Sequence, residues 1–151
     1  MKAGRYLYEK SISYQGHLVI PFVRSRVNRQ PIYSYALLSE IGHKGLFHQS
    51  ENPTQLYSCH LNRVFEIAKK HLENYFGVVK SPHDYFQHRY TYCKNLIIVH
   101  QELGKFFYDH YLPDVLNNIA APKIFESEAE CLLWVQQGID RHTISFASDR
   151  N

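Results

Sequence analysis

The sequence has few residues of the kinds that mark specialised protein classes. Its 151 residues include three cysteines, which lie far apart, at Cys59, Cys93 and Cys131. An odd and sparse set of cysteines does not form a disulfide framework and favours a reducing compartment. No run of 18 apolar residues occurs, and the N-terminus lacks the apolar segment of a secretory signal. We therefore expect a cytoplasmic protein that does not contact a membrane.

The motifs of the common catalytic and cofactor-binding classes are also missing. The chain has no glycine-rich phosphate loop, no Cys-x-x-Cys and no His-Glu-x-x-His. Glu40 and His43 have the Glu-x-x-His spacing of di-iron bundles, but Gly42 between them favours a turn instead of a helix face. The sequence thus predicts no cofactor, and it favours a protein that is not an enzyme.

The composition is that of a globular domain with an excess of tyrosine and histidine. Hydrophobic residues make up 44% and charged residues 21%, which excludes a disordered or fibrous chain. The length predicts a single domain, which we place at residues 1–140, followed by a loosely ordered tail over residues 141–151. The 12 tyrosines and 10 histidines are more than a small core needs. They predict either an aromatic core or a surface that binds a partner or a ligand.

Charge is distributed unevenly along the chain. Residues 1–50 carry 7 Lys and Arg against 2 Asp and Glu, whereas residues 101–151 carry 4 against 8. A basic first third and an acidic last third can attract each other between copies. This asymmetry favours self-association as much as nucleic-acid binding, and it is equally typical of an ordinary solvated surface.

The first 50 residues have the alternating pattern of antiparallel strands. Gln15-Gly16 is a two-residue turn signal, and Pro21 predicts an edge strand or a bulge. The predicted strands are Arg5–Tyr14, His17–Arg24, Pro31–Ser39 and a short Leu46–His48.

The middle of the chain changes to helical spacing. Apolar residues predict a helix over residues 56–76, which Gly77 ends. A second apolar stripe, from Phe86 to Tyr111, predicts a long helix over residues 82–112 that opens at Ser81-Pro82. The alternative is that Leu96–Val99, a short apolar run rich in β-branched residues, is a buried strand.

The C-terminal part has a capping box, Ser127 to Glu130, that predicts one more helix. This helix should end at Gly138 and bury Trp134 in the core. The predicted fold is therefore α+β: an N-terminal antiparallel sheet of three to four strands, packed against a long antiparallel helix pair, with a C-terminal capped helix.

Three segments near the C-terminus resemble the closing unit of SpoIIAA-like STAS domains, in which an apolar strand, a helix, a short strand and a capped helix follow in order. The segments are Leu96–His100, Lys123–Phe125 and Ser127–Val135. The resemblance covers less than a third of the chain and requires the strand alternative for residues 96–100. The first half of the chain does not follow the pattern of that family, so we do not assign the chain to it.

Two groups of residues are candidate sites. Arginines alternate in the connection after the second predicted strand, close to two tyrosines, as in sites that hold phosphates and stack bases. This polyanion site would comprise Arg24, Arg26, Arg29, Tyr33 and Tyr35. Scattered histidines could converge on a ligand or a metal ion, namely His43, His48, His60 and His100.

These features support three functions. The first is a non-catalytic interaction or regulatory module that forms a homodimer or binds another protein. The second is a nucleic-acid or polyanion binder that uses the Arg24–Arg29 hairpin. The third is a small-ligand or metal site lined by tyrosine and histidine.

Overall fold

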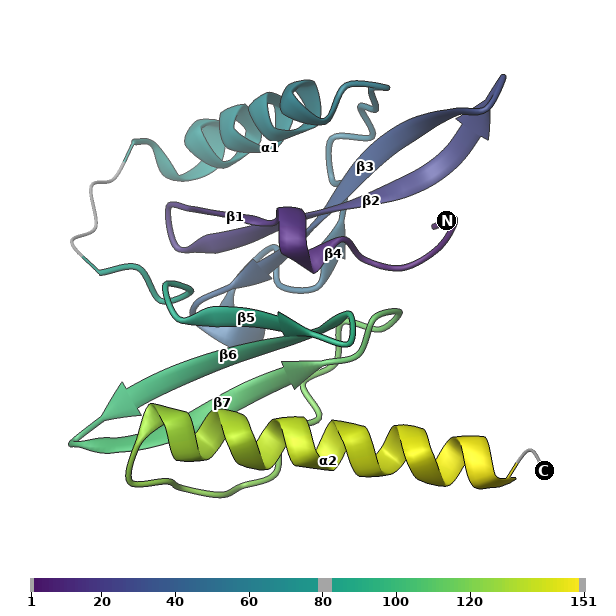
Figure 1. The fold of residues 1–151 in the computed structure, drawn as a ribbon. Helices are drawn as coiled ribbons and strands as arrows, with labels where there is room; N and C mark the ends of the chain where they lie inside the picture. Colours follow the sequence, from purple (N-terminus) through teal and green to yellow (C-terminus); the bar gives the residue numbers. More distant parts are fainter. Residues whose placement is uncertain (1, 79–82, 150–151) are drawn as a thin grey trace.

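The structure is a computed structural model that describes residues 2–78 and 83–149, with the side chains of the last helix described as far as His142. The chain runs twice through a meander of antiparallel strands followed by a helix (Figure 1). The first unit contains the 3-10 helix η1 (Tyr8–Lys10), β1 (Ile12–Tyr14), β2 (His17–Val27), β3 (Gln30–Ser39), the 3-10 helix η2 (Gly42–Lys44), β4 (Ser50–Glu51) and α1 (Leu61–Phe76). The second contains β5 (Arg89–Tyr92), β6 (Asn95–Glu102), β7 (Lys105–Tyr111) and α2 (Glu128–Asp149).

Both sheets are antiparallel and keep the order of the sequence. The first sheet has the strand order β1-β2-β3-β4, and the second has the order β5-β6-β7. Four hairpins close through two residues that both have positive φ, as a type I′ turn requires. These turns are Gln15-Gly16, Asn28-Arg29, Cys93-Lys94 and Leu103-Gly104.

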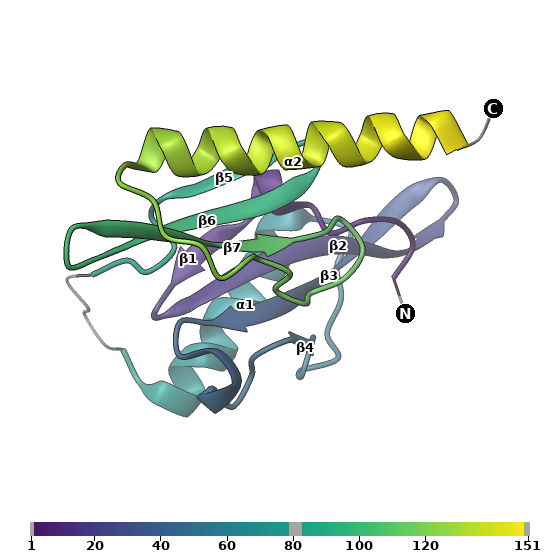
Figure 2. The ribbon, with the colours of Figure 1, turned by 90° about the horizontal axis from the view of Figure 1, so that it is seen from below.

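The two sheets face each other, and a helix covers the outer face of each (Figures 1 and 2). The resulting layers are α1, the first sheet, the second sheet and α2. The core between the sheets joins residues such as Leu18 and Ile20 to Leu96 and Ile98. Residues of opposite parity on the same strands pack under the helices, so that β2 and β6 are buried on both faces.

This double burial explains why the prediction of a long helix over residues 82–112 is wrong. Leu96, Ile97, Ile98 and Val99 are all at most 4% exposed, because successive side chains enter different cores. An uninterrupted apolar run is what a doubly covered strand requires, so the strand alternative is correct. No helix pair forms, since α1 and α2 lie on opposite outer faces (Figure 1). Ser81 and Pro82 lie outside the described residues.

The order of elements in the structure differs from the order that the resemblance to STAS domains implies. Leu96–His100 is extended, as that resemblance requires, but the next element is the strand β7 and not a helix. In addition, β6 is the middle strand of an antiparallel meander.

The helix predicted over residues 56–76 is confirmed, with a later start at Leu61. Its buried residues Val64, Ala68 and Leu72 face β2 and β3. Gly77 ends the helix with a φ of +70°, and its N–H donates to the carbonyl of Glu73 at 2.8 Å.

The first sheet agrees with the prediction in its three main strands and differs at both ends. The predicted strand Arg5–Tyr14 divides into η1 and β1, and the last strand is Ser50–Glu51, not Leu46–His48. Pro21 lies inside a central strand. Its carbonyl accepts from Leu7 N at 2.9 Å, so the side of Pro21 that lacks an N–H faces the N-terminal segment and not β3. The predicted bulge lies just beyond it, between Val23 and Ser25.

The capped C-terminal helix is confirmed, with a different end. Ser127 Oγ accepts from the backbone N of Glu130 at 3.1 Å, as a capping residue does. The helix does not stop at Gly138 but continues to Asp149. Trp134, predicted to be buried, is half-buried against Tyr108. A loosely ordered tail over residues 141–151 stays a prediction, because residues 150 and 151 lie outside the described part.

Candidate functional site

The arginines of the predicted polyanion site are exposed, but the tyrosines are not available to them. Arg24 and Arg26 lie near the end of β2, with Arg29 in the turn that follows. Tyr35 is fully buried, and Tyr33 packs in the cluster between the first sheet and α1. Arg24 instead stacks over the ring of Tyr57, at 4.2 Å from its centroid. The structure therefore places arginines and a different tyrosine together at this hairpin.

The predicted histidine set is only partly brought together. The rings of His43 and His48 lie 5.1 Å apart, whereas His60 is exposed at the start of α1. His100 is buried between the sheets and pairs with Asp109. Over residues 2–78 and 83–149, no three histidine, cysteine or acidic side chains are arranged to hold a metal ion. Within the same residues, no helix is both long and apolar enough to span a membrane.

A cavity of about 470 Å³ lies between α2 and the outer face of the second sheet. Asn95, Tyr108 and His110 line it from the strands, and Leu112, Pro113 and Ile119 line it from the segment that follows β7. The helix contributes Trp134, Val135, Gly138, Ile139 and His142. This volume lies within the range of sites that hold small molecules.

One of the residues that α2 contributes to the lining is a glycine, Gly138. A Cβ atom built on Gly138 would meet no atom within 4 Å. One and two turns earlier, Val135 and Cys131 are buried against Ile97 and Val99, so the helix contacts the sheet closely there. The missing side chain at Gly138 therefore adds to the open space beside α2.

Hydrogen bonds at the floor of the cavity fix the state of His110. Asn95 Nδ2 donates to the carbonyl of Cys93 at 2.9 Å, so Asn95 Oδ1 is the acceptor that lies 2.9 Å from His110 Nε2. His110 Nε2 must then carry the proton, which leaves Nδ1 as an acceptor. Burial lowers the pKa of His110, so the ring is uncharged at neutral pH. The floor thus presents one neutral ring acceptor beside a buried amide.

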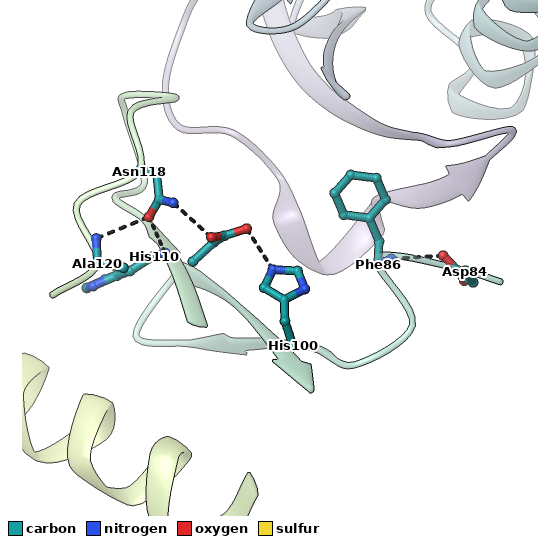
Figure 3. Close-up of polar contacts among 7 residues, drawn as sticks. Asp84, Phe86, His100, His110, Asn118 and Ala120 are labelled. Carbon is teal, nitrogen blue, oxygen red and sulfur yellow. Dashed lines mark hydrogen bonds and ion pairs between the residues drawn. The ribbon is translucent and has the colours of Figure 1, made fainter. Parts of the chain in front are cut away.

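A polar network holds the wall of the cavity against β7 (Figure 3). Asn118 Oδ1 accepts from the backbone N–H groups of His110 and Ala120, at 3.0 and 3.1 Å. Asn118 Nδ2 donates to Asp109 Oδ1 at 2.8 Å. Asp109 Oδ2 in turn accepts from His100 Nε2 at 2.8 Å. This chain of contacts ties the segment after β7 to the interior of the sheets and so fixes the position of Ile119.

The side of the cavity near the start of α2 is aromatic. Trp134 lies against Tyr108 and Phe125, with ring centroids 6.1 and 5.7 Å away. Lys123 Nζ lies 4.8 Å from the centroid of the Trp134 ring. The Tyr108 hydroxyl accepts from the backbone N of Ala121 at 2.9 Å and so holds the connection to α2. Tyr108 and Trp134 thus offer apolar ring surface to a ligand.

The groups around the cavity are suited to binding and not to nucleophilic chemistry. Burial raises the pKa of the Cys131 thiol to about 11, so the thiol stays protonated. Burial also raises the pKa of Tyr108. No carboxylate, lysine or arginine is among the lining residues in the described part of the chain. The arrangement can therefore enclose an uncharged molecule and orient it by hydrogen bonds.

The sequence analysis did not identify Asn95, His110 or Gly138 as site residues. Asn95 and His110 fall within the helix that was predicted over residues 82–112, and Gly138 was interpreted as a helix end. Gly138 was nevertheless a usable signal, because a glycine in a helix interior is unfavourable unless space or packing requires it.

Comparisons with known proteins give no relative: no family model matches the chain, and neither does any curated protein or solved structure.

Proposed function

We propose that the protein is a non-catalytic module that binds a small, largely apolar and uncharged ligand in the cavity under α2. The proposal rests on two features of this cavity: the open space beside Gly138 and the hydrogen-bond acceptor of His110. The helix leaves an open space of about 470 Å³, and a neutral imidazole with an unused acceptor lies at its floor. A ligand that fits has an aromatic or aliphatic body and one N–H or O–H group for His110 Nδ1.

Burial and charge support this choice of ligand. The lining is formed by aromatic and aliphatic side chains together with Asn95 and two histidines. A charged ligand would lose its hydration with no opposite charge in the lining to replace it. An uncharged ligand with one donor loses little and gains a hydrogen bond in an apolar site.

Indole is a suitable probe, because it is flat, apolar and uncharged and has a single N–H donor. We expect saturable shifts of the amide resonances of Asn95, His110 and Gly138 in an NMR titration with indole. N-methylindole has the same body and no donor, so it should bind about 2- to 10-fold more weakly. Equal affinities for indole and N-methylindole would show that His110 does not accept a hydrogen bond from the ligand. An absence of saturable shifts would contradict the proposal as a whole.

A pair of variants on α2 separates the cavity from the helix surface. Gly138→Leu fills the cavity and should abolish the titration, with the helix intact by circular dichroism. Gln137→Leu adds the same side chain at a neighbouring exposed position and should leave the binding of indole unchanged. Loss of binding in both variants would place the probe elsewhere on α2.

Two of the sequence-based functions stay predictions. Homodimerisation was expected to use sheet residues such as Tyr33 and Tyr35 or the predicted helix pair, but Tyr35 is buried, Tyr33 packs beside α1, and the predicted helix pair does not form. A dimer would therefore have to use another surface. Polyanion binding at Arg24, Arg26 and Arg29 would depend on the arginines and Tyr57, without Tyr33 and Tyr35.

A further inference from the structure

A second cavity, of about 380 Å³, lies beside the C-terminal end of α1 and the β1–β2 turn. The β1–β2 turn contributes Gln15, Gly16 and His17, and the end of β3 contributes Ser39 and Glu40. Ile41, Lys44, Gly45, Leu46 and Phe76 complete the lining. It shares no residue with the cavity under α2.

Two residues that line this second cavity carry buried hydrogen-bond acceptors that lack partners. His17 is 6% exposed, and its Nδ1 lies 3.1 Å from the carbonyl of Gln15, which can only accept. Nδ1 is therefore the protonated nitrogen, and Nε2 is an acceptor. His17 Nε2 and Gln15 Oε1 are both buried without a hydrogen-bond partner. Buried polar atoms in native proteins are nearly always satisfied, so each of these two requires a donor.

A carboxylate, that of Glu40, lines the same cavity. Glu40 lies across Gly16, where an added Cβ would come within 3.0 Å of the Glu40 carboxyl carbon. The charge of Glu40 acts on the pKa of His17 in the direction that favours protonation, but burial has the larger effect and lowers that pKa. The His17 ring thus stays neutral beside an anionic group. Two acceptors and one negative charge together favour a donor that is also a cation.

The remaining walls are apolar and leave room for the body of such a ligand. The Phe76 ring stacks on His17, with centroids 5.4 Å apart and planes at 29°. Ile41, Leu46 and Phe76 are 58%, 67% and 43% exposed, so they form an apolar rim that is open to solvent.

We propose that this second cavity binds a small organic amine, with its ammonium group directed to Gln15, His17 and Glu40 and its apolar body against Phe76. The class of ligand follows from the donors that the two acceptors require, the charge of Glu40 and the apolar rim. Lys44 is the cation that lines the same cavity, so it opposes the ligand by charge repulsion.

The test uses 2-phenylethylamine as the probe and 2-phenylethanol as its uncharged counterpart, titrated by calorimetry or NMR against the full chain. We expect the amine to bind saturably and the alcohol to bind at least about tenfold more weakly. Equal binding of the two, or no saturable binding of the amine, would overturn the proposal and leave the two acceptors satisfied by water.

Three variants assign the site. Glu40→Gln should weaken the binding of the amine by about tenfold or more, whereas Glu102→Gln, an exposed acid at the tip of the β6–β7 hairpin, should not. Lys44→Met should strengthen it. Weaker binding in Lys44→Met, or equal binding in Glu40→Gln and Glu102→Gln, would contradict the assignment. Since Gly138→Leu should leave the binding of the amine unchanged, this site and the cavity under α2 can fail independently.

Discussion

Replacing Gly138 with alanine should stabilise the protein, whereas the same replacement at Gly104 should destabilise it. Neither glycine has an atom within 4 Å of an added Cβ, so no steric clash distinguishes them. Gly138 lies inside α2, while Gly104 has a φ of +75° in the β6–β7 turn. The two positions therefore isolate the effect of backbone conformation.

The expected magnitudes follow from the two conformations. In a helix interior, alanine is more favourable than glycine by about 1 kcal/mol. In the left-handed region, a side chain costs about 1–2 kcal/mol. For a chain of this length, 1 kcal/mol changes the melting temperature by about 2–4 °C. Gly138→Ala should raise the melting temperature by about 2–4 °C, and Gly104→Ala should lower it by about 2–8 °C.

Urea unfolding followed by circular dichroism measures both effects. The midpoint should rise for Gly138→Ala and fall for Gly104→Ala, with the slope of the transition unchanged. If Gly138→Ala were destabilising, α2 would not have free space beneath it, and the cavity would be smaller than described. If both variants were stabilising, the β6–β7 turn would not have the backbone conformation of the structure.

The sequence was sufficient where one face of an element is buried and the other is exposed. The apolar stripe of α1 gave its extent to within a few residues, because one side packs on the sheet and the other is in solvent. The turn at Gln15-Gly16 was predicted because a glycine occupies the second position with positive φ.

The sequence was insufficient where an element is buried on both faces. Apolar and polar residues do not alternate over Leu96–Val99, because all four side chains are buried. The preceding turn, Cys93-Lys94, has positive φ at two residue types that are not typical of such turns. Apolar residues at helical spacing could therefore be assigned to one helix although they belong to β5, β6 and β7. The double burial depends on the partner sheet and on α2, which are distant in the chain, so local pattern could not reveal it.

The candidate sites could not be predicted for the same reason, because they depend on contacts between elements that are distant in the chain. The excess of tyrosine was compatible with a core or with a binding surface, and several tyrosines are core residues between or beside the sheets, namely Tyr6, Tyr8, Tyr35, Tyr108 and Tyr111. The two cavities depend on how helices lie over sheets. Asn95 and His110 adjoin Gly138 only because β6 and β7 are strands under α2.

Three further predictions test the layers and the network. Burial lowers the pKa of four histidines, so the unfolded chain takes up protons at a higher pH than the folded one. The free energy of unfolding should therefore be at its full value above about pH 6.5 and decline as the pH falls below it. A constant free energy of unfolding from pH 7.5 to 5.5, measured by urea unfolding, would contradict this prediction. These residues are His17, His48, His71 and His110. Asn118→Ala removes the acceptor of two backbone N–H groups at exposed positions and should cost about 0.5–1.5 kcal/mol, whereas Asn117→Ala, at the adjacent exposed position with one 3.5 Å contact from Gln49, should change stability by less than about 0.5 kcal/mol. Ile97 and Ile98 are adjacent and point to opposite faces of β6, yet both are fully buried. In a sheet with one covered face, truncating only one of them would be costly. In the four-layer arrangement, Ile97→Ala and Ile98→Ala should each lower the free energy of unfolding by about 2–5 kcal/mol, because each removes methyl groups from a separate closed core. Thr91→Ala on the exposed part of β5 is the control, expected within about 0.5 kcal/mol of the parent. If one of the two isoleucine variants unfolded like the control, the face of β6 to which that residue points would not be covered.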